Sequence, residues 1–313
     1  MRAIWLKNMD TGATWDLLPQ NPYPKATGWD GCPLLGIGGM GYSQDITQNQ
    51  VGVDYFVSKI STKNSDVTGT FLFWDDSHLE AFQNFVGDFR KQLMLFYSPS
   101  GEYEFGDQIS ENNIYRKPVI ISKVSKTEKT EQCVYECGVT FSTQSDVWKR
   151  YVVYEKEDVE VVGDAHVYPY TYNYVYGGRN TFEIAVPNYG RETGCRITIT
   201  NTSESAISQI EWFIDSTYVD DYGVEHTDTQ RSKWLLGLRQ GDKLVVDSNA
   251  TTQQAIVTYS INGTSQNVVS AQEPSWEYIN FVQLPHGQNR FVFYAEQNKV
   301  NVKFEYWEQK ELI

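Results

Sequence analysis

The sequence has few of the residues that most often carry chemistry. Its 313 residues include only four cysteines and four histidines. The scattered cysteines do not make the framework of a secreted disulfide scaffold, and no two histidines have the spacing of a zinc-binding pair. We therefore expect reduced, buried thiols and no metal centre. The residues concerned are Cys32, Cys133, Cys137 and Cys195, and His78, His166, His226 and His286.

Long hydrophobic runs and positive charge are also scarce. No stretch approaches the roughly 18 apolar residues of a membrane span, and residues 3–6 are cut off by Lys7, too short for a secretion signal. With 26 Lys+Arg against 40 Asp+Glu, the net charge is −14. This field repels phosphate backbones and anionic lipids. The sequence predicts a soluble protein made in a cytoplasm, without nucleic-acid or membrane partners.

Catalytic and cofactor motifs are missing or lack their context. No G-x-S-x-G elbow and no Walker-type loop occurs. Residues 36–41 match the G-x-G-x-x-G pattern of dinucleotide sites, but Pro33 lies upstream and residues 42–51 show no helical stripe, so we expect no cofactor. We predict instead a flexible or arm-forming loop that makes assembly contacts through Gly36, Gly38, Gly39 and Gly41.

Carboxylates are abundant, and a glycoside hydrolase needs only two of them across a sugar. Those that stand out lie in polar runs, which are typical of a solvated face: Glu155, Glu157, Asp158, Asp220 and Asp221. We expect no enzyme.

What the sequence does have is aromatic residues, 14% of the chain, while strong helix formers are sparse. This composition favours a mainly β fold. One helix is predicted over residues 77–92, with Ser77 and Glu80 as a capping box. Its apolar stripe, expected to pack on a sheet, consists of Leu79, Phe82, Phe85, Val86 and Phe89.

Short strands are predicted on both sides of this helix and throughout the rest of the chain. In the first domain they cover residues 53–60, 69–74, 93–97, 118–125 and 132–142. In the last of these, Cys133 and Cys137 should face the core with Tyr135. In the second domain they cover residues 181–186, 195–200, 209–214, 243–247, 254–261, 264–269, 278–284, 290–295 and 300–307. Their even spacing indicates a β-sandwich, with a hairpin turn at Asn262-Gly263 and a polar loop over residues 221–229.

The predicted organisation is therefore a β-rich α+β domain with one helix (1–150), a connecting segment (151–178) and a β-sandwich (179–313). The connecting segment contains five closely spaced tyrosines. Disordered linkers are poor in aromatics, so we expect an extended segment lying on a neighbouring surface. Its candidate assembly contacts are Tyr168, Tyr170, Tyr172, Tyr174 and Tyr176.

Tryptophans in the second domain offer an alternative function. Trp212, Trp234 and Trp276 could form a stacking platform for sugar rings, although most tryptophans of a sandwich belong to its core or to an interface. A carbohydrate-binding accessory module that recognises host cell-wall glycans is therefore the second hypothesis.

Motifs in a fixed order carry a family resemblance. The second domain contains Leu238-x-x-Gly241-Asp242-x-Leu244-x-Val246-Asp247, the Asn262-Gly263 hairpin and Phe281-x-x-Leu284-Pro285-x-Gly287-x-Asn289-x-Phe291. The first contains the helix over 79–89 followed by Leu93-Met94-Leu95, then Arg116-Lys117-Pro118-Val119 and Phe141-x-x-x-Ser145-Asp146-x-Trp148. Together they resemble the distal tail protein family of long-tailed bacteriophages that infect Gram-positive bacteria. Residues 10–42 and 216–232 show the weakest resemblance.

The resemblance implies a structural virion protein of the tail tip, or baseplate. N-terminal domains would build a homohexameric ring that joins the tail tube to the tail-tip hub and the host-adsorption apparatus. The C-terminal domains would be galectin-like sandwiches. Implied partners are other copies, the tail tube protein, the hub or tail-associated lysin, and receptor-binding proteins. The galectin signatures H-x-N-x-R and W-x-x-E are missing, since residues 286–290 have the wrong spacing, so the shared fold implies no sugar binding.

Overall fold

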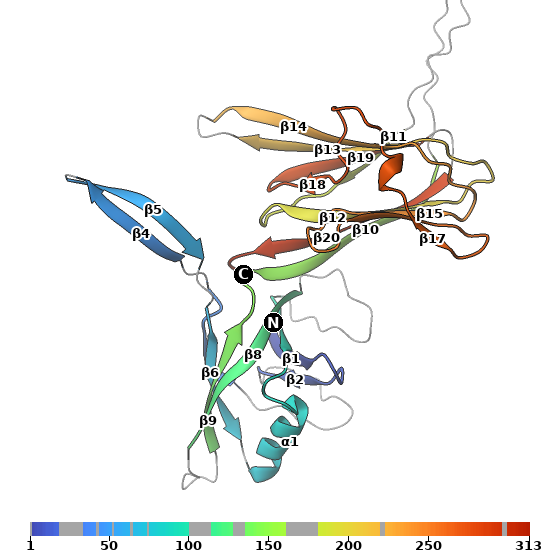
Figure 1. The fold of residues 1–313 in the computed structure, drawn as a ribbon. Helices are drawn as coiled ribbons and strands as arrows, with labels where there is room; N and C mark the ends of the chain where they lie inside the picture. Colours follow the sequence, from blue (N-terminus) through green and yellow to red (C-terminus); the bar gives the residue numbers. More distant parts are fainter. Residues whose placement is uncertain are drawn as a thin grey trace, which may run out of the picture. The chain divides into compact units, whose positions relative to one another are not determined.

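The computed structural model describes residues 2–18, 34–41, 44–51, 53–62, 65–73, 75–99, 114–127, 135–160, 181–219, 223–295 and 299–313. The chain divides into two compact units: unit 1 is Met1–Arg150 with Lys310–Ile313, and unit 2 is Tyr151–Gln309 (Figure 1). Both are mainly β, as predicted. Several residues named above lie outside the described residues: Cys32, Cys133, His166, Tyr168, Tyr170, Tyr172, Tyr174, Tyr176, Asp220 and Asp221.

Unit 1 is an antiparallel sheet with a helix on one face. Strands β2, β1, β7 and β8 are neighbours in that order. The first residues of β8 also pair with the start of β10, and the second half of β8 pairs with β9. β9 in turn pairs with β6, and β6 with β3. The bounds are β1 (Ala3–Asn8), β2 (Thr14–Asp16), β3 (Leu34–Gly38), β6 (Val67–Phe73), β7 (Leu93–Ser98), β8 (Tyr115–Lys126), β9 (Tyr135–Thr143) and β10 (Trp148–Glu160).

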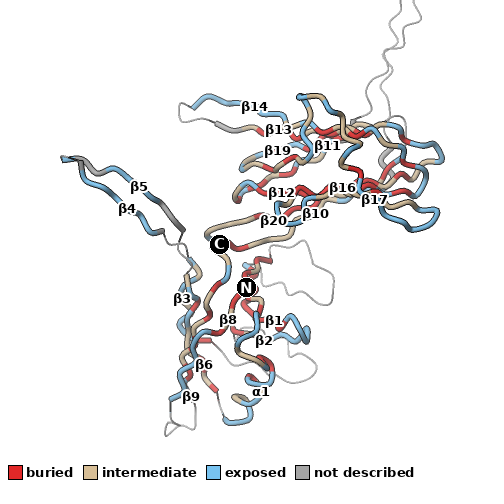
Figure 2. Tube along the Cα trace, viewed as in Figure 1, coloured by how far each residue is buried: buried red, intermediate tan, exposed pale blue. Residues whose placement is uncertain are grey.

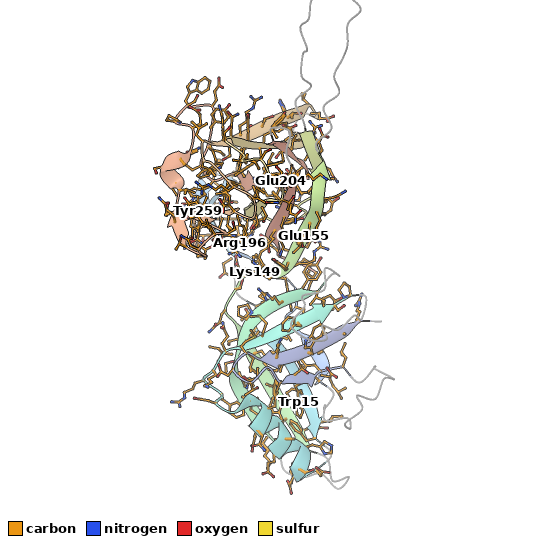
Figure 3. All side chains as sticks on the ribbon, turned by 90° about the vertical axis from the view of Figure 1, so that its right-hand side faces the viewer. Trp15, Lys149, Glu155, Arg196, Glu204 and Tyr259 are labelled. Carbon is orange, nitrogen blue, oxygen red and sulfur yellow. The ribbon has the colours of Figure 1, made fainter. Side chains whose placement is uncertain are left out.

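The core of unit 1 is aromatic and lies between the sheet and helix α1 (Asp76–Val86). Phe82 and Phe85 of the helix are buried, as the apolar stripe predicts. The ring of Trp15, labelled in Figure 3, packs edge-on against Phe82 with centroids 5.2 Å apart. Cys137 alternates inward with Tyr135 on β9, which confirms the predicted core face of that strand.

The predicted ends of the helix are wrong. Its N-cap is Asp75, whose carboxylate accepts the backbone N–H of His78 at 3.0 Å, so no capping box forms from Ser77 and Glu80. The Ser77 hydroxyl instead donates to Asp75 at 2.6 Å, and these bonds hold the pKa of Asp75 well below its usual range. The helix stops at Val86, short of residue 92, because Gly87 takes a φ of 68° and donates its N–H to Gln83 O.

Unit 2 is a two-layered β-sandwich, which confirms that prediction. One sheet has the order β17-β16-β15-β12-β20-β10 and the other β11-β19-β13-β14. The bounds are β11 (Thr181–Ala185), β12 (Thr193–Asn201), β13 (Ile210–Val219), β14 (Glu225–Trp234), β15 (Lys243–Asp247), β16 (Gln254–Thr258), β17 (Ser265–Asn267), β19 (Gln288–Ala295) and β20 (Lys299–Lys310); the short strand β18 (Gln283–Leu284) pairs with β12, and a 3₁₀ turn spans Val269–Ala271.

Buried side chains from both sheets form one core in unit 2. Figure 2 shows buried stretches along the strands of each layer. Ile197 and Phe304 from one sheet and Ile214 and Phe293 from the other are all fully buried. Burying such side chains stabilises a fold by about 1.5–3 kcal/mol each. This core accounts for the predicted alternation in the second domain.

Several strands differ from the sequence prediction. The prediction of a polar loop over residues 221–229 is wrong for its second half. Glu225 to Thr229 belong to β14 and pair with β13. The predicted strand over 278–284 shrinks to β18. The predicted turn at Asn262-Gly263 is confirmed, with a φ of 66° at Gly263. Glu155 and Glu157 are exposed, as a solvated face requires. In the described part of the chain, no helix has the length and apolar character of a membrane span.

Candidate assembly site

A two-stranded hairpin leaves the sheet of unit 1 between β3 and β6. Its strands are β4 (Gln44–Val51) and β5 (Asp54–Thr62), and among the described strands they pair only with each other (Figure 1). The register runs from Gln44 opposite Thr62 to Val51 opposite Asp54, with one bulge. We call this hairpin, residues 44–62, the arm.

The arm exposes apolar side chains. Ile46 is 52% exposed, Val57 51% and Phe56 57%. Ile46 pairs with Ile60 and Gln48 pairs with Val57, so Ile46 and Val57 lie on one face of the ribbon while Phe56 lies on the other. An isolated two-stranded hairpin is only marginally stable in water, and exposed apolar surface of this kind marks interaction sites. The arm therefore has the properties of a contact element.

The root of the arm is rigidly built. Ser65, where the chain returns from the arm, donates its hydroxyl to the carbonyl oxygens of Gly39 at 2.9 Å and Gly41 at 3.2 Å. Thr143 of β9 in turn donates to Ser65 O at 3.1 Å. Gly39 has a φ of 80°, and a Cβ there would overlap the carbonyl of Asp66. Only glycine fits this position, so the backbone at the root is fixed against the sheet.

The glycine prediction is partly wrong. Gly36 and Gly38 are not in a loop but in β3, whose register shifts between Leu35 and Gly38. Gly36 has a φ of 62°, and such a bulge blunts an edge strand against unwanted pairing. Gly39 and Gly41 lie at the arm root. Their part in assembly stays a prediction.

The proposed tryptophan platform is wrong for two of its three members. Trp212 and Trp234 are 0% exposed and stack on each other in the sandwich core, with ring centroids 6.2 Å apart. Both indole rings are buried in the core because removing such a large apolar area from water stabilises the fold. Trp276 is 90% exposed and stands in the loop before β18. A sugar-stacking role of Trp276 stays a prediction.

The cysteines and histidines of the described residues lie in separate parts of the fold. No group of three or more His, Cys, Asp or Glu side chains in this part of the chain could hold a metal. Cys137 and Cys195 are free and buried, as predicted, and burial raises the pKa of Cys195 to about 12. His78 contacts the helix cap at Asp75, and the His286 ring contacts the carbonyl of Gly190.

The arm residues were missed at the sequence level. The prediction included a strand over 53–60, but not its partner β4, because Gln48 and Gln50 of that strand are polar and exposed. Gly52 with flanking valines, between two runs of β propensity, is the one signal of a hairpin there. Ile46 and Val57 could have been found from it.

Fold and site together define a two-unit antiparallel β protein with a projecting hairpin. No family model and no curated protein matches the sequence. Among solved structures, the chain is similar to the SPP1 Dit (gp 19.1) protein, described as a paradigm of the hub adsorption apparatus in Gram-positive infecting phages. The identity is 12%, the TM-score 0.54, and 99% of each chain is covered.

Two further structures show the phage P2 baseplate in its activated conformation, with Ca and with Sr. Each covers 100% of both chains at a TM-score of 0.47, with 12% and 13% identity. These scores are too low to carry weight. The SPP1 likeness, at its low identity, shows a shared fold, and it extends over 99% of this chain.

Proposed function

We propose that this chain is a structural protein of a bacteriophage tail tip, an adaptor that joins the tail tube to the tail-tip hub and the host-adsorption apparatus. The observation that carries the proposal is the full-length likeness to the SPP1 Dit protein, which covers 99% of both chains. A partial match would support a shared module only. Here the likeness extends over both units of this chain.

In this proposal the chain forms a homohexameric ring through unit 1. The arm supports it, because its exposed Ile46 and Val57 need a surface to cover them and every copy would offer the same surface to its neighbour. Repetition of one such heterologous contact closes a ring when the rotation between neighbours is a whole fraction of a turn. The tail tube protein, the hub or tail-associated lysin, and receptor-binding proteins are the proposed further partners, at the tail tip of the virion.

Mass photometry of the purified full chain tests the ring. We expect a species of six times the 36.0 kDa chain mass at micromolar concentration, and negative-stain images of that species should show a closed ring. A sample that contains only monomer at this concentration would contradict the proposal, and a ring of another size would correct the stoichiometry.

A further inference from the structure

One tyrosine of unit 1 contacts both segments through which the chain passes between the units. Unit 1 ends at Arg150 and resumes at Lys310. Arg150 lies opposite Tyr115 in the pairing of β10 with β8, and its guanidinium carbon is 5.8 Å from the centre of the Tyr115 ring. The Lys310 Nζ donates to the Tyr115 hydroxyl at 3.1 Å and is 5.4 Å from the ring centre. We call Tyr115, Arg150 and Lys310 the clasp; all three belong to unit 1.

The clasp is built on the core of unit 1. Tyr115 is only 6% exposed and belongs to the aromatic cluster that also contains Tyr97 and Trp148. Its strand is paired on both sides here, with Tyr97 of β7 and Arg150 of β10 as the register partners of Tyr115. The two cations are attracted to the ring, and the ring cannot move without disturbing the packing of the core. A change in this packing at Tyr115 therefore reaches both segments at once.

The same two strands are joined to each other on the unit 2 side. Tyr151 directly follows Arg150, and its ring centre lies 4.7 Å from that of Trp307 on β20. The Tyr151 hydroxyl donates to Glu305, which is also on β20 and is 8% exposed. β10 and β20 are neighbours in the large sheet of unit 2. Both segments are thus held by side-chain contacts on each side of the unit boundary.

No loop separates the clasp from unit 2. Arg150 and Tyr151 are consecutive residues of β10, and Gln309 and Lys310 are consecutive residues of β20. Domains that are joined by an exposed flexible linker move independently by default. Here the connection consists of two strand backbones that are both anchored to one ring. Segments that open together form one cooperative unit, and these contacts favour joint opening of the two units over separate opening.

We propose that the clasp couples the stability of the two units, so that they open together and not one by one. Tyr115 is the residue through which loosening of the unit 1 core reaches β10 and β20, and through them the core of unit 2. This coupling belongs to the single chain and does not depend on the proposed ring. Its consequence is that a partner which binds and stabilises one unit also stabilises the other.

Hydrogen exchange of the full chain, measured by mass spectrometry, tests the coupling. Val139 of β9 is 2% exposed and belongs to the unit 1 core. Val139→Ala leaves a cavity and should speed exchange of the slowest β7 amides of unit 1 about tenfold or more. With an intact clasp, the slowest β12 amides of unit 2 should speed up by the same factor. In the background Arg150→Met/Lys310→Met, we expect Val139→Ala to speed exchange in β7 alone.

Lys126→Met is the matched control. The Lys126 Nζ lies 4.7 Å from the centre of the Tyr135 ring, so the same kind of contact is lost in the same unit, away from the two segments. In this background β7 and β12 should still respond together. If the double variant shows no protected amides in β7, Lys310→Met alone decides the outcome, and the β12 response should then be smaller than the β7 response.

Three results would overturn the proposal. One is a β12 response that is absent already in the chain with an intact clasp, because the units would then open separately. Another is a shared response that survives the loss of both clasp cations. The last is uncoupling by Lys126→Met as well, which would show that the loss of any such cation in unit 1 suffices. Variants are compared at the same oligomeric state, measured by mass photometry, so that failure of the ring is not mistaken for failure of the coupling.

Discussion

Asp242 is a buried carboxylate that holds two segments of unit 2 together. It accepts the backbone N–H of Ser260 at 2.8 Å and that of Arg239 at 2.9 Å, and also the Ser260 hydroxyl. Burial alone would raise the pKa of Asp242, but these hydrogen bonds outweigh it, so its pKa lies below the ordinary 3.8. Asp242 therefore stabilises the fold when ionised.

The lowered pKa of Asp242 determines how its contribution to the free energy of unfolding changes with pH. The stabilisation is fully present above the unfolded pKa and is lost as pH falls through the folded pKa. We expect Asp242→Asn to cost about 1–3 kcal/mol at pH 7 and clearly less at pH 2–3. Urea unfolding followed by tryptophan fluorescence at both pH values measures this. Asp228→Asn, at an exposed position, is the control; an equal loss at both pH values for Asp242→Asn would contradict the expectation.

Gly39 allows a sharp test of the arm root. Gly39→Ala should lower the free energy of unfolding by about 2–4 kcal/mol, because alanine resists a positive φ and its Cβ would meet the Asp66 carbonyl. Gly41→Ala is the matched control, since nothing lies within 4 Å of a Cβ there, and should stay within about 0.5 kcal/mol. Thermal unfolding compares the two. Equal melting temperatures would show that the root is less constrained than the structure indicates.

Single residues were predictable where one strong preference acts alone. Gly263 satisfies a turn that needs positive φ, and the Phe82 stripe follows helical spacing. The N-cap of the helix could not be predicted. Asp75, Asp76 and Ser77 follow one another and are all favourable N-cap residues, so the local sequence does not show which of them begins the helix.

At the scale of elements, the two faces of the arm make different predictions. Ile46→Glu places a charge on the face shared with Val57 and should strongly reduce the proposed ring, because a charge cannot be buried there without a partner. Thr47→Glu adds the same charge to the neighbouring, opposite face of the same strand and should reduce it less. Mass photometry at equal concentration measures both. If both variants assemble like the unmodified chain, the arm is not the ring contact.

Burial accounts for the prediction of some strands only, since the exposed β17 was predicted and the buried β1 was not. β15, with a buried alternation, was predicted with its observed ends. β14 was missed because residues 225–229 are exposed, so hydrophobic periodicity has nothing to register. β4 was not predicted for the same reason. β4 and β14 each form a hairpin, β4 with β5 and β14 with β13. The pairing of such polar strands depends on the neighbouring strand and cannot be read from the hydrophobic pattern of the polar strand itself.

At the scale of the whole molecule, net charge opposes assembly. Copies that each carry −14 repel one another, and salt screens this repulsion beyond about 10 Å at 0.1 M. If the proposed hexamer forms through the apolar arm, we expect its fraction to rise between 20 and 300 mM NaCl, since an apolar contact is not weakened by screening. Mass photometry across this series tests it. A ring that dissociates as salt rises would show instead that ion pairs hold it.

The path of the chain has a consequence for biosynthesis. β10 starts in unit 1 and continues into unit 2, and residues 310–313 belong to unit 1 again. There the Lys310 Nζ bonds the Tyr115 hydroxyl at 3.1 Å, and Ile313 packs against the aromatic core. A ribosome therefore supplies the final pieces of unit 1 only after all of unit 2 has been translated. A chain whose synthesis stops early has an incomplete unit 1. A ring built from unit 1 would therefore incorporate only subunits in which both units have been fully synthesised.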